Sequence, residues 1–507
     1  MIISLSVLVI TIIVSGTYAL YKAQLSKNIG VNTTTHGLAY YINYVKGTDI
    51  TAATLNPSTS YEGGASSDIE FWKKDDSYDI YGKIELTVNT IGTNLSNSPA
   101  LKYAVVNNGN VLKEGSLKGT TSGSKVTILK NLYLEQTKQI YTVYVWLDNS
   151  EELGNISNES LSISVDCTAS LQKEPTAADT IISLYTSAAK VTATNNSITY
   201  NTAPSVSLMN DRLGGTTTSL DGGNIRYYGA SPNNYIYFNC SDYSNQTSST
   251  CETWRIIGVF DGKLKLIRGS QIGKYSWDNK NTSTGAEDNY GKNDWTTARL
   301  MKLLNPRDYY KVDSNDNNLG QSLYYNSASG KCYSGQNNAT VDCDFTSTGI
   351  KNDETRNMIA ETTYYLGGWN SYSVYPNEIY EYERGTTVYT GRPPTWPGKI
   401  ALAYPSDYGY AADLNQCKDK TLYYYDNSTC TSNNWMKAIL GTSSHGWLLT
   451  PRSGGSYNAW NVYSGGYVGS TYLAYYAIGA VPVLSLSSKL GIESGDGSSS
   501  NPYKLSA

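Results

Sequence analysis

The stretch TWRIIGVFDGKLKLIRG, residues 253–269, decides the fold class of the second half of the chain. It contains two alternating apolar runs, and Asp261-Gly262 between them is the signal for a type I′ turn. The stretch therefore predicts a β-hairpin. From this hairpin outward, the sequence predicts a mixed α+β domain over residues 223–490 with long irregular loops.

Two short helices are expected in that domain. One is predicted over Asp294–Leu304 with Asp294 as its N-cap, and the other over Asn352–Tyr365, ended by Gly367-Gly368.

The first part of the chain has a period of two. KIELTV (83–88), YTVYVWL (141–147) and LSISVDC (161–167) alternate apolar and polar residues, and turn-forming residues separate them. Strands of this kind bury one face each, so residues 33–170 are predicted to form an antiparallel, jelly-roll-like β-sandwich.

Residues 174–222 are expected to hold a helix and then a linker. Thr176 can cap the helix, because Asp179 follows three residues later. The Thr-, Asn- and Gly-rich composition of the remainder is typical of a connector. Residues 491–507 are expected to form an exposed tail.

The composition excludes one class of partner and favours another. The 507 residues include 39 basic and 43 acidic side chains, and a net charge of −4 argues against binding nucleic acid. Tyrosine outnumbers phenylalanine by 46 to 4. Because tyrosine combines an apolar ring with a polar tip, this bias favours half-exposed sites and binding surfaces.

Residues 1–22 indicate export. No charge precedes Lys22, and the apolar run from Ile2 to Val14 has the length of a signal-peptide core. Together with its neighbours the run approaches the length that spans a bilayer, so both a cleaved leader and a retained anchor stay open. Any membrane contact is expected through this segment alone, with the rest of the chain at the cell surface or secreted.

The cysteines fall into three local couples, which are Cys240 and Cys251, Cys332 and Cys343, and Cys417 and Cys430. In an exported chain, close couples predict disulfides, which would staple three loops; Cys167 is left over. No C-x-x-C occurs and His36 and His445 are the only histidines, so no metal and no cofactor is expected. The calcium-like run 313–318 lacks the required glycine and glutamate, which favours a solvated turn.

A catalytic constellation is not found. The sequence GTSSHG around His445 does not match the nucleophile elbow G-x-S-x-G, and no phosphate-binding or dinucleotide motif occurs. The only carboxylates worth testing for acid–base chemistry are Asp407 and Glu383. The chain is therefore expected not to be an enzyme.

A tyrosine-rich segment stands between two apolar runs, Trp447–Thr450 and Val481–Leu486. Its tyrosine, glycine, serine and asparagine content is that of antibody loops, in which rings make contact and small polar residues adapt. We therefore predict a displayed loop near residues 454–476, on a flexible glycine-rich backbone, and these ligand-binding residues: Tyr457, Trp460, Tyr463, Tyr467 and Tyr472. The alternative, left open for each ring, is packing beneath the loops.

Two resemblances add to this reading. The leader joint VSGTYALYKAQ resembles export signals of camelysin-like and biofilm-fibre proteins of Gram-positive bacteria, whose mature part is a jelly-roll sandwich. WRIIGVFDGKLKLIRG, DWTTARLMKLLN, GWLLTPRS and IGAVPVLSL, in this order, resemble a surface-protein family of Firmicutes and mollicutes. That family looks related to C-type-lectin-like folds of the formylglycine-generating-enzyme type.

The second resemblance implies a C-type-lectin-like fold for residues 223–490. Where related proteins often read G-V-R-P-V-L, this chain has Gly479–Leu484 without the arginine. The cysteine couples also do not match the copper-binding pair of formylglycine-generating enzymes, so that activity is not expected.

Three hypotheses follow. The first is an adhesin-like binding protein that recognises an extracellular glycan or protein; the second is a structural component of a fibre or biofilm matrix. The third, an enzyme, would need a polar cleft around Asp407 and Glu383.

Overall fold

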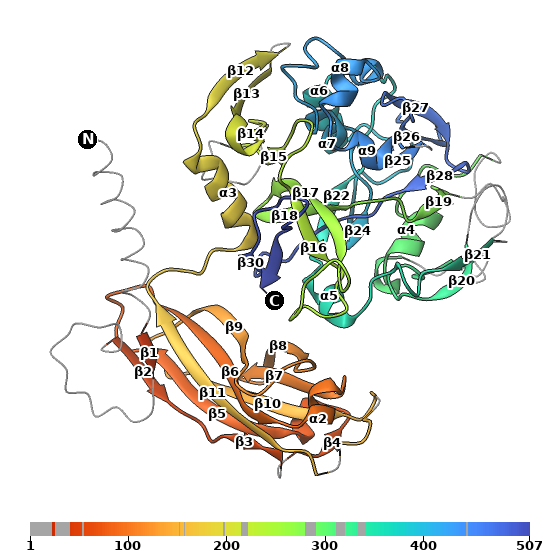
Figure 1. Cartoon of the computed structure of the whole chain (residues 1–507). Coiled ribbons are helices and arrows are strands. Elements are labelled where there is room, and N and C mark those ends of the chain that lie inside the picture. The colour runs from red at the N-terminus through yellow and green to blue at the C-terminus, as the bar shows by residue number, and fades with distance from the viewer. Residues whose placement is uncertain are drawn as a thin grey trace, which may run out of the picture. The chain divides into compact units, whose positions relative to one another are not determined.

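The chain forms two compact units, Met1–Glu174 (unit 1) and Pro175–Ala507 (unit 2) (Figure 1). The computed structural model describes residues 23–25, 41–52, 55–151, 153–156, 158–195, 198–213, 222–278, 290–310, 320–332, 341–442 and 445–506. The expected leader, residues 1–22, and the calcium-like run 313–318 lie outside the described residues. Within the described ranges, no helix is long and apolar enough to cross a membrane.

Unit 1 consists of two β-sheets. One has the order β1-β11-β6-β9, with β3 beside β11, and the other the order β2-β5-β10-β7-β8, with β4 beside β10. The elements are β1 Ala23–Leu25, β2 Ile42–Val45, β3 Ile50–Thr51, β4 Pro57–Ser58, β5 Ala65–Lys73, β6 Tyr81–Ile91, α2 Thr93–Asn97, β7 Leu101–Asn107, β8 Asn110–Ser116, β9 Lys125–Tyr133, β10 Ile140–Asp148 and β11 Leu161–Ser170.

The period of two in the sequence explains why these strands form a layered core. In β6, Ile84, Leu86 and Val88 are fully buried, while the residues between them are only half-buried. They join one hydrophobic core with side chains of β10 and β7 from the other sheet, such as Val143 and Val105. The predicted antiparallel β-rich organisation is confirmed, apart from the parallel pair of β10 and β4.

Unit 2 is mixed, with two larger sheets and short helices. The larger sheet has the order β12-β13-β14-β15-β17-β18-β29-β24, with β16 beside β17, and the second has the order β19-β28-β25-β26-β27. The strands are β12 Val191–Asn195, β13 Ile198–Ala203, β14 Leu208–Asn210, β15 Ile225–Tyr227, β16 Tyr235–Phe238, β17 Glu252–Phe260, β18 Lys263–Arg268, β19 Gly273–Ser276, β20 Ser329–Cys332, β21 Val341–Asp344, β22 Thr362–Tyr365, β23 Thr395–Gly398, β24 Ile400–Ala401, β25 Gly446–Pro451, β26 Asn458–Val462, β27 Val468–Leu473, β28 Ala477–Ala480, β29 Val483–Ser485, β30 Gly491–Ser494 and β31 Lys504–Ser506.

The helices of unit 2 are short. They are α3 Ala177–Ser187, α4 Arg299–Leu304, α5 Asp353–Met358, α6 Pro376–Arg384, α7 Pro405–Tyr410, α8 Ser428–Ser432 and α9 Lys437–Leu440, and a 3-10 turn, η9, covers Leu422–Tyr424.

The hairpin predicted from residues 253–269 is present as β17 and β18. Phe260 pairs with Lys263, and the two residues between them have positive φ, 49° at Asp261 and 70° at Gly262. These are the angles of a type I′ turn, whose twist matches that of the flanking strands. The hairpin lies in the middle of the larger sheet, between β15 and β29.

The linker and the exposed tail were wrong predictions. The Thr176 capping box and the helix after it are present, but Val191–Asn195, Ile198–Ala203 and Leu208–Asn210 then form β12, β13 and β14 of the larger sheet. Side chains such as Tyr200 and Met209 are fully buried there. The polar composition of the segment does not predict this burial. At the other end, β30 and β31 pair, and Tyr503 and Leu505 are buried against the main core.

Both helices expected in the second half are shorter than predicted. Asp294 accepts hydrogen bonds from the backbone N and the hydroxyl of Thr296, and this local turn delays the first helix to Arg299. Asn352 does cap the second helix, but that helix ends at Met358, because residues 362–365 pair with β23 instead.

Three disulfides join the predicted couples, Cys240–Cys251, Cys332–Cys343 and Cys417–Cys430. Each closes a loop of 11 or 13 residues in unit 2. Cys167 keeps a free thiol in the buried core of unit 1. The three bonds indicate an oxidising environment such as the cell exterior.

Replacing Cys417 and Cys430 together with alanine is expected to lower the free energy of unfolding by up to about 3 kcal/mol. The reason is that the unfolded chain regains the entropy that the closed loop had removed. Urea unfolding without reductant measures the difference from the parent. The same comparison under reductant is the control, and there the difference should shrink; equal stability without reductant would contradict the prediction.

Candidate functional site

The tyrosine-rich segment is part of a sheet and not a displayed loop. Residues 446–480 form β25, β26, β27 and β28, which lie side by side with β19. Trp460 lies in β26 and is fully buried in a hydrophobic core with Val462 and Leu448. The prediction that Trp460 is exposed was therefore wrong, because the strand Asn458–Val462 is buried along its whole length.

The turn between β26 and β27 brings two of the predicted rings together. Tyr463 and Tyr467 face each other across this turn, where the backbone N of Tyr463 donates to the carbonyl of Tyr467 at 2.9 Å. Gly466 completes the turn with a φ of 102°, an angle that favours glycine. The two rings stack with centroids 4.1 Å apart and planes inclined by 13°. The hairpin therefore presents a flat, two-ring stack.

This stack is the centre of a larger surface that we call the aromatic belt. Its members are half-buried or exposed rings whose neighbouring centroids lie 4.1–6.1 Å apart. The belt consists of Tyr290, Tyr372, Tyr423, Tyr424, His445, Tyr457, Tyr463, Tyr467, Tyr472, Tyr475 and Tyr476. Contiguous exposed rings of this kind are the type of surface feature from which a binding site can be proposed.

The most exposed members lie at several points along the belt. Tyr424 is 54 % exposed, and Tyr290, Tyr476 and Tyr423 are 39–41 % exposed. Tyr472, in contrast, packs partly against the main core and contacts Trp447. The belt is therefore held by the core on one side and open on the other.

A glycine next to a tyrosine in this segment makes room for the ring. A Cβ atom at Gly469 would lie 2.5 Å from Cε2 of Tyr463, which is closer than such atoms approach. The Tyr463 ring thus lies flat over the bare backbone of β27. The sequence prediction explained these glycines by backbone flexibility. At Gly469 the structure gives a different reason, because only glycine leaves room for the Tyr463 ring.

The belt also has polar character, from His445 within it and from Asp426 near Tyr467. His445 lies 4.5 Å from Tyr463 and 5.1 Å from Tyr472, and its Nδ1 accepts a hydrogen bond from the backbone N of Ser464. Burial lowers the pKa of His445, so the imidazole is neutral at pH 7. Burial, the neighbouring rings and Asp426 raise the pKa of Tyr467, which keeps its hydroxyl protonated. The belt thus offers hydroxyls, a neutral imidazole and one nearby carboxylate.

Four of the rings predicted from the sequence are half-buried members of the belt, and the sequence prediction missed other members. Tyr457, Tyr463, Tyr467 and Tyr472 belong to the belt, whereas the rings from other segments, Tyr290, Tyr372, Tyr423 and Tyr424, were not predicted. The run LYYYD at 422–426 was a usable signal, since adjacent tyrosines cannot all face one core. In that run Leu422 and Tyr425 are buried, whereas Tyr423 and Tyr424 are exposed.

The two carboxylates considered for catalysis lie together in the core. Asp407 caps α7 and pairs with Arg226 and Lys265, and Arg226 also pairs with Asp211. Glu383 accepts hydrogen bonds from the backbone N and hydroxyl of Ser406 at 2.9 and 2.6 Å. We call these groups the buried ionic cluster. Glu383 and Asp407 are 0 % and 2 % exposed, so neither faces solvent.

The pH dependence of stability should report on Glu383. Burial raises its pKa to about 7, against 4.5 for a free side chain. The folded protein then binds a proton that the unfolded chain releases, and this stabilising contribution is complete below about pH 4.5 and lost as the pH rises through about 7. Relative to Glu383→Gln, the parent is expected to lose about 3 kcal/mol over that window.

Urea unfolding of both proteins at about pH 4.5, 6 and 7.5 measures this difference. Glu381→Gln is the matched control, since Glu381 is exposed on the same helix, and its difference from the parent should not vary in the same way. A constant difference between the parent and Glu383→Gln would contradict the assignment.

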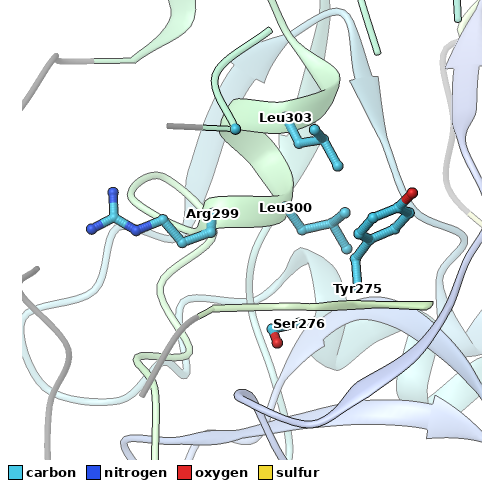
Figure 2. A pocket seen from close by; sticks show the side chains of 6 residues that line it. Tyr275, Ser276, Arg299, Leu300 and Leu303 are labelled. Atoms are coloured by element: carbon cyan, nitrogen blue, oxygen red, sulfur yellow. The ribbon is translucent and has the colours of Figure 1, made fainter. Parts of the chain in front are cut away.

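One small pocket of unit 2 was considered as a site for a small molecule. A pocket beside α4 is lined by Tyr275, Arg299, Leu300 and Leu303, and Figure 2 shows the two leucines facing the tyrosine ring. Its volume is about 10 Å³, the room that one water molecule needs. In the part of the chain that the structure describes, no three His, Cys, Asp or Glu side chains gather to hold a metal ion.

No protein-family model matches the chain, and no curated protein matches its sequence. Similar solved structures include the receptor-binding domain of botulinum neurotoxin mosaic serotype C/D, at 11 % identity and a TM-score of 0.15. The match covers 52 % of this chain and 75 % of that domain. A mutant named HCR/D matches at the same identity and TM-score over 51 % and 76 %. Likeness at this level carries no argument about fold or function.

Proposed function

We propose that this protein is an adhesin-like binding protein of the cell surface or the extracellular space, and that unit 2 recognises a glycan or protein ligand through the aromatic belt. The observation that carries the proposal is the belt itself, a continuous surface of half-buried and exposed rings centred on the Tyr463–Tyr467 stack. The three disulfides support an extracellular location.

The chemistry of the belt suits both kinds of ligand. Tyrosine rings offer large apolar area with few rotatable bonds, so little entropy is lost when a ligand covers them. Their hydroxyls, together with His445 and Asp426, can then orient hydroxyl or amide groups of the ligand. We further propose that a C-type-lectin-like scaffold carries this surface.

Screening the purified full-length chain on glycan and protein arrays tests the proposal. For any ligand found, Tyr467→Ala is expected to weaken binding about tenfold or more, since a lost ring contact is worth about 1.4 kcal/mol or more. Tyr78→Ala is the matched control, because Tyr78 is 44 % exposed on unit 1, outside the belt. Titration by calorimetry measures both.

Two results would count against the proposal. One is a folded protein that binds nothing on either array. The other is a ligand whose affinity falls as much with Tyr78→Ala as with Tyr467→Ala, since binding would then not depend on the belt.

A second candidate function, a fibre component, is favoured by strand β8. It is the last strand of its sheet, and its Val111 and Leu112 are 43 % and 36 % exposed. Edge strands with exposed apolar residues can pair with another chain. Electron microscopy of the purified protein separates the two functions: regular filaments support this candidate, and monodisperse particles oppose it.

A further inference from the structure

The buried ionic cluster contains a lysine and an aspartate in direct contact. The Nζ atom of Lys265, in β18, donates to Oδ2 of Asp407, at the start of α7. Their side chains are 7 % and 1 % exposed, and the rings of Phe260 and Tyr404 lie 4.9 and 4.5 Å from the ammonium. An amine thus rests against a carboxyl group in a buried site from which water is largely excluded.

We propose that Lys265 and Asp407 condense after folding into an intramolecular amide bond that joins β18 to α7. The two residues are 142 positions apart in the sequence, so only the folded chain brings them together. The bond would be a covalent link in the interior of unit 2, distinct from the three disulfides and independent of what the aromatic belt binds.

The charges of the cluster favour this product. Before the reaction, four charged side chains, Arg226, Lys265, Asp211 and Asp407, lie in a region that is 0–7 % exposed. Each buried ion costs several kcal/mol of lost hydration. Condensation removes one positive and one negative charge, and the remaining pair, Arg226 and Asp211, stays joined by its own hydrogen bond of 2.6 Å.

Neighbouring donors activate the carboxyl group. Nη1 of Arg226 donates to Oδ1 of Asp407 at 3.1 Å, the position from which it would stabilise negative charge on that oxygen during attack. The backbone N of Tyr404 donates to Oδ2, the oxygen that leaves, at 3.0 Å. Both donors are fixed in place before the reaction begins.

Burial and the neighbouring charges set the protonation of the two reacting groups. Burial lowers the pKa of Lys265, with Arg226 and Arg384 adding to the effect, which increases the share of free amine. Burial opposes ionisation of Asp407, but the charges of Lys265 and Arg226 outweigh it and lower its pKa. The reactants therefore start as an ion pair.

The step balances without any further reactant. A proton passes from the ammonium to the carboxylate, and the lone pair of Nζ then attacks Cγ of Asp407. The Nζ–Cγ bond forms, and the Cγ–Oδ2 bond breaks with its electron pair going to oxygen. Two protons that began on Nζ leave with that oxygen as water, and one stays on the amide nitrogen.

Mass spectrometry of the purified, reduced full-length protein tests the proposal. The expected intact mass is lower than that of the sequence by one water molecule, and digestion should yield a branched peptide containing Lys265 and Asp407. Lys265→Met and Asp407→Ala should each restore the mass of their own sequences.

The chain offers an internal control. Lys102 and Asp148 form an ion pair of the same residue types at 2.6 Å, but their side chains are 26 % and 13 % exposed. Peptides containing these two residues should stay linear. The proposal is overturned if the parent protein has the full mass of its sequence and gives only linear peptides with unmodified Lys265. Because the parent alone decides this, a variant that fails to fold does not affect the test.

Discussion

Replacing Arg226 with methionine is expected to lower the free energy of unfolding of unit 2 by about 3–5 kcal/mol. Arg226 is 1 % exposed, and its guanidinium pairs with both Asp211 and Asp407. Its loss leaves Asp211 as an uncompensated buried charge. The free-energy cost of that lone charge is larger than the net stabilisation that the intact ion pair provides. Rings of Phe260 and Tyr410 that pack on the guanidinium would lose their partner as well.

Urea unfolding followed by tryptophan fluorescence measures this effect in the right unit. Of the ten tryptophans, all but Trp72 and Trp146 lie in unit 2. Arg307→Met is the matched control, because Arg307 is exposed and its replacement should change stability by no more than about 0.5 kcal/mol. The double variant Arg226→Met, Asp211→Asn should recover part of the loss. A loss below about 1 kcal/mol in the single variant would refute the importance of the cluster.

Replacing Trp460 with alanine is expected to lower the free energy of unfolding by a similar amount, about 3–5 kcal/mol. The indole is fully buried among Leu448, Val462 and Val468, and a cavity would replace it. This result would separate Trp460 from the belt residues with which the sequence grouped it. Urea unfolding measures the loss, and Tyr476→Ala is the control, because Tyr476 is 40 % exposed.

The control should cost at most about 0.5 kcal/mol. Where Trp460→Ala still folds, its affinity for a ligand of the belt should equal that of the parent. A stable Trp460→Ala variant with weakened binding would instead support the original prediction of a contact residue.

Features with a local cause could be predicted from the sequence. The turn at Asp261-Gly262, the capping box at Thr176 and the three cysteine couples each depend on residues within about a dozen positions of one another. Strands β12–β14 could not be predicted, because their polar composition resembles a linker and only pairing with β15 and β17 makes them part of a sheet.

The candidate site was only partly predictable for the same reason. Rings on the β26–β27 turn follow from nearby glycines, and four of those predicted are half-exposed. Trp460 was predicted to be exposed, because the glycine-rich sequence around it is typical of a loop. Only the pairing of β26 with β25 and β27 shows that it lies in a buried strand. Tyr290 and Tyr423 come from other segments and reach the belt only in the folded chain. Asp407 and Glu383 were noticed as isolated carboxylates, and their burial beside each other had no local signal.

The position of β29 determines when the edge of β18 can be paired. This strand, residues 483–485, lies between β18 and β24. Leu266 of β18 pairs with Leu484 of β29. During synthesis, the edge of β18 therefore stays unpaired while more than two hundred further residues are added. Such long-range pairing folds slowly and exposes an edge to other chains. Until β29 is available, this edge of β18 is a site at which unit 2 can aggregate.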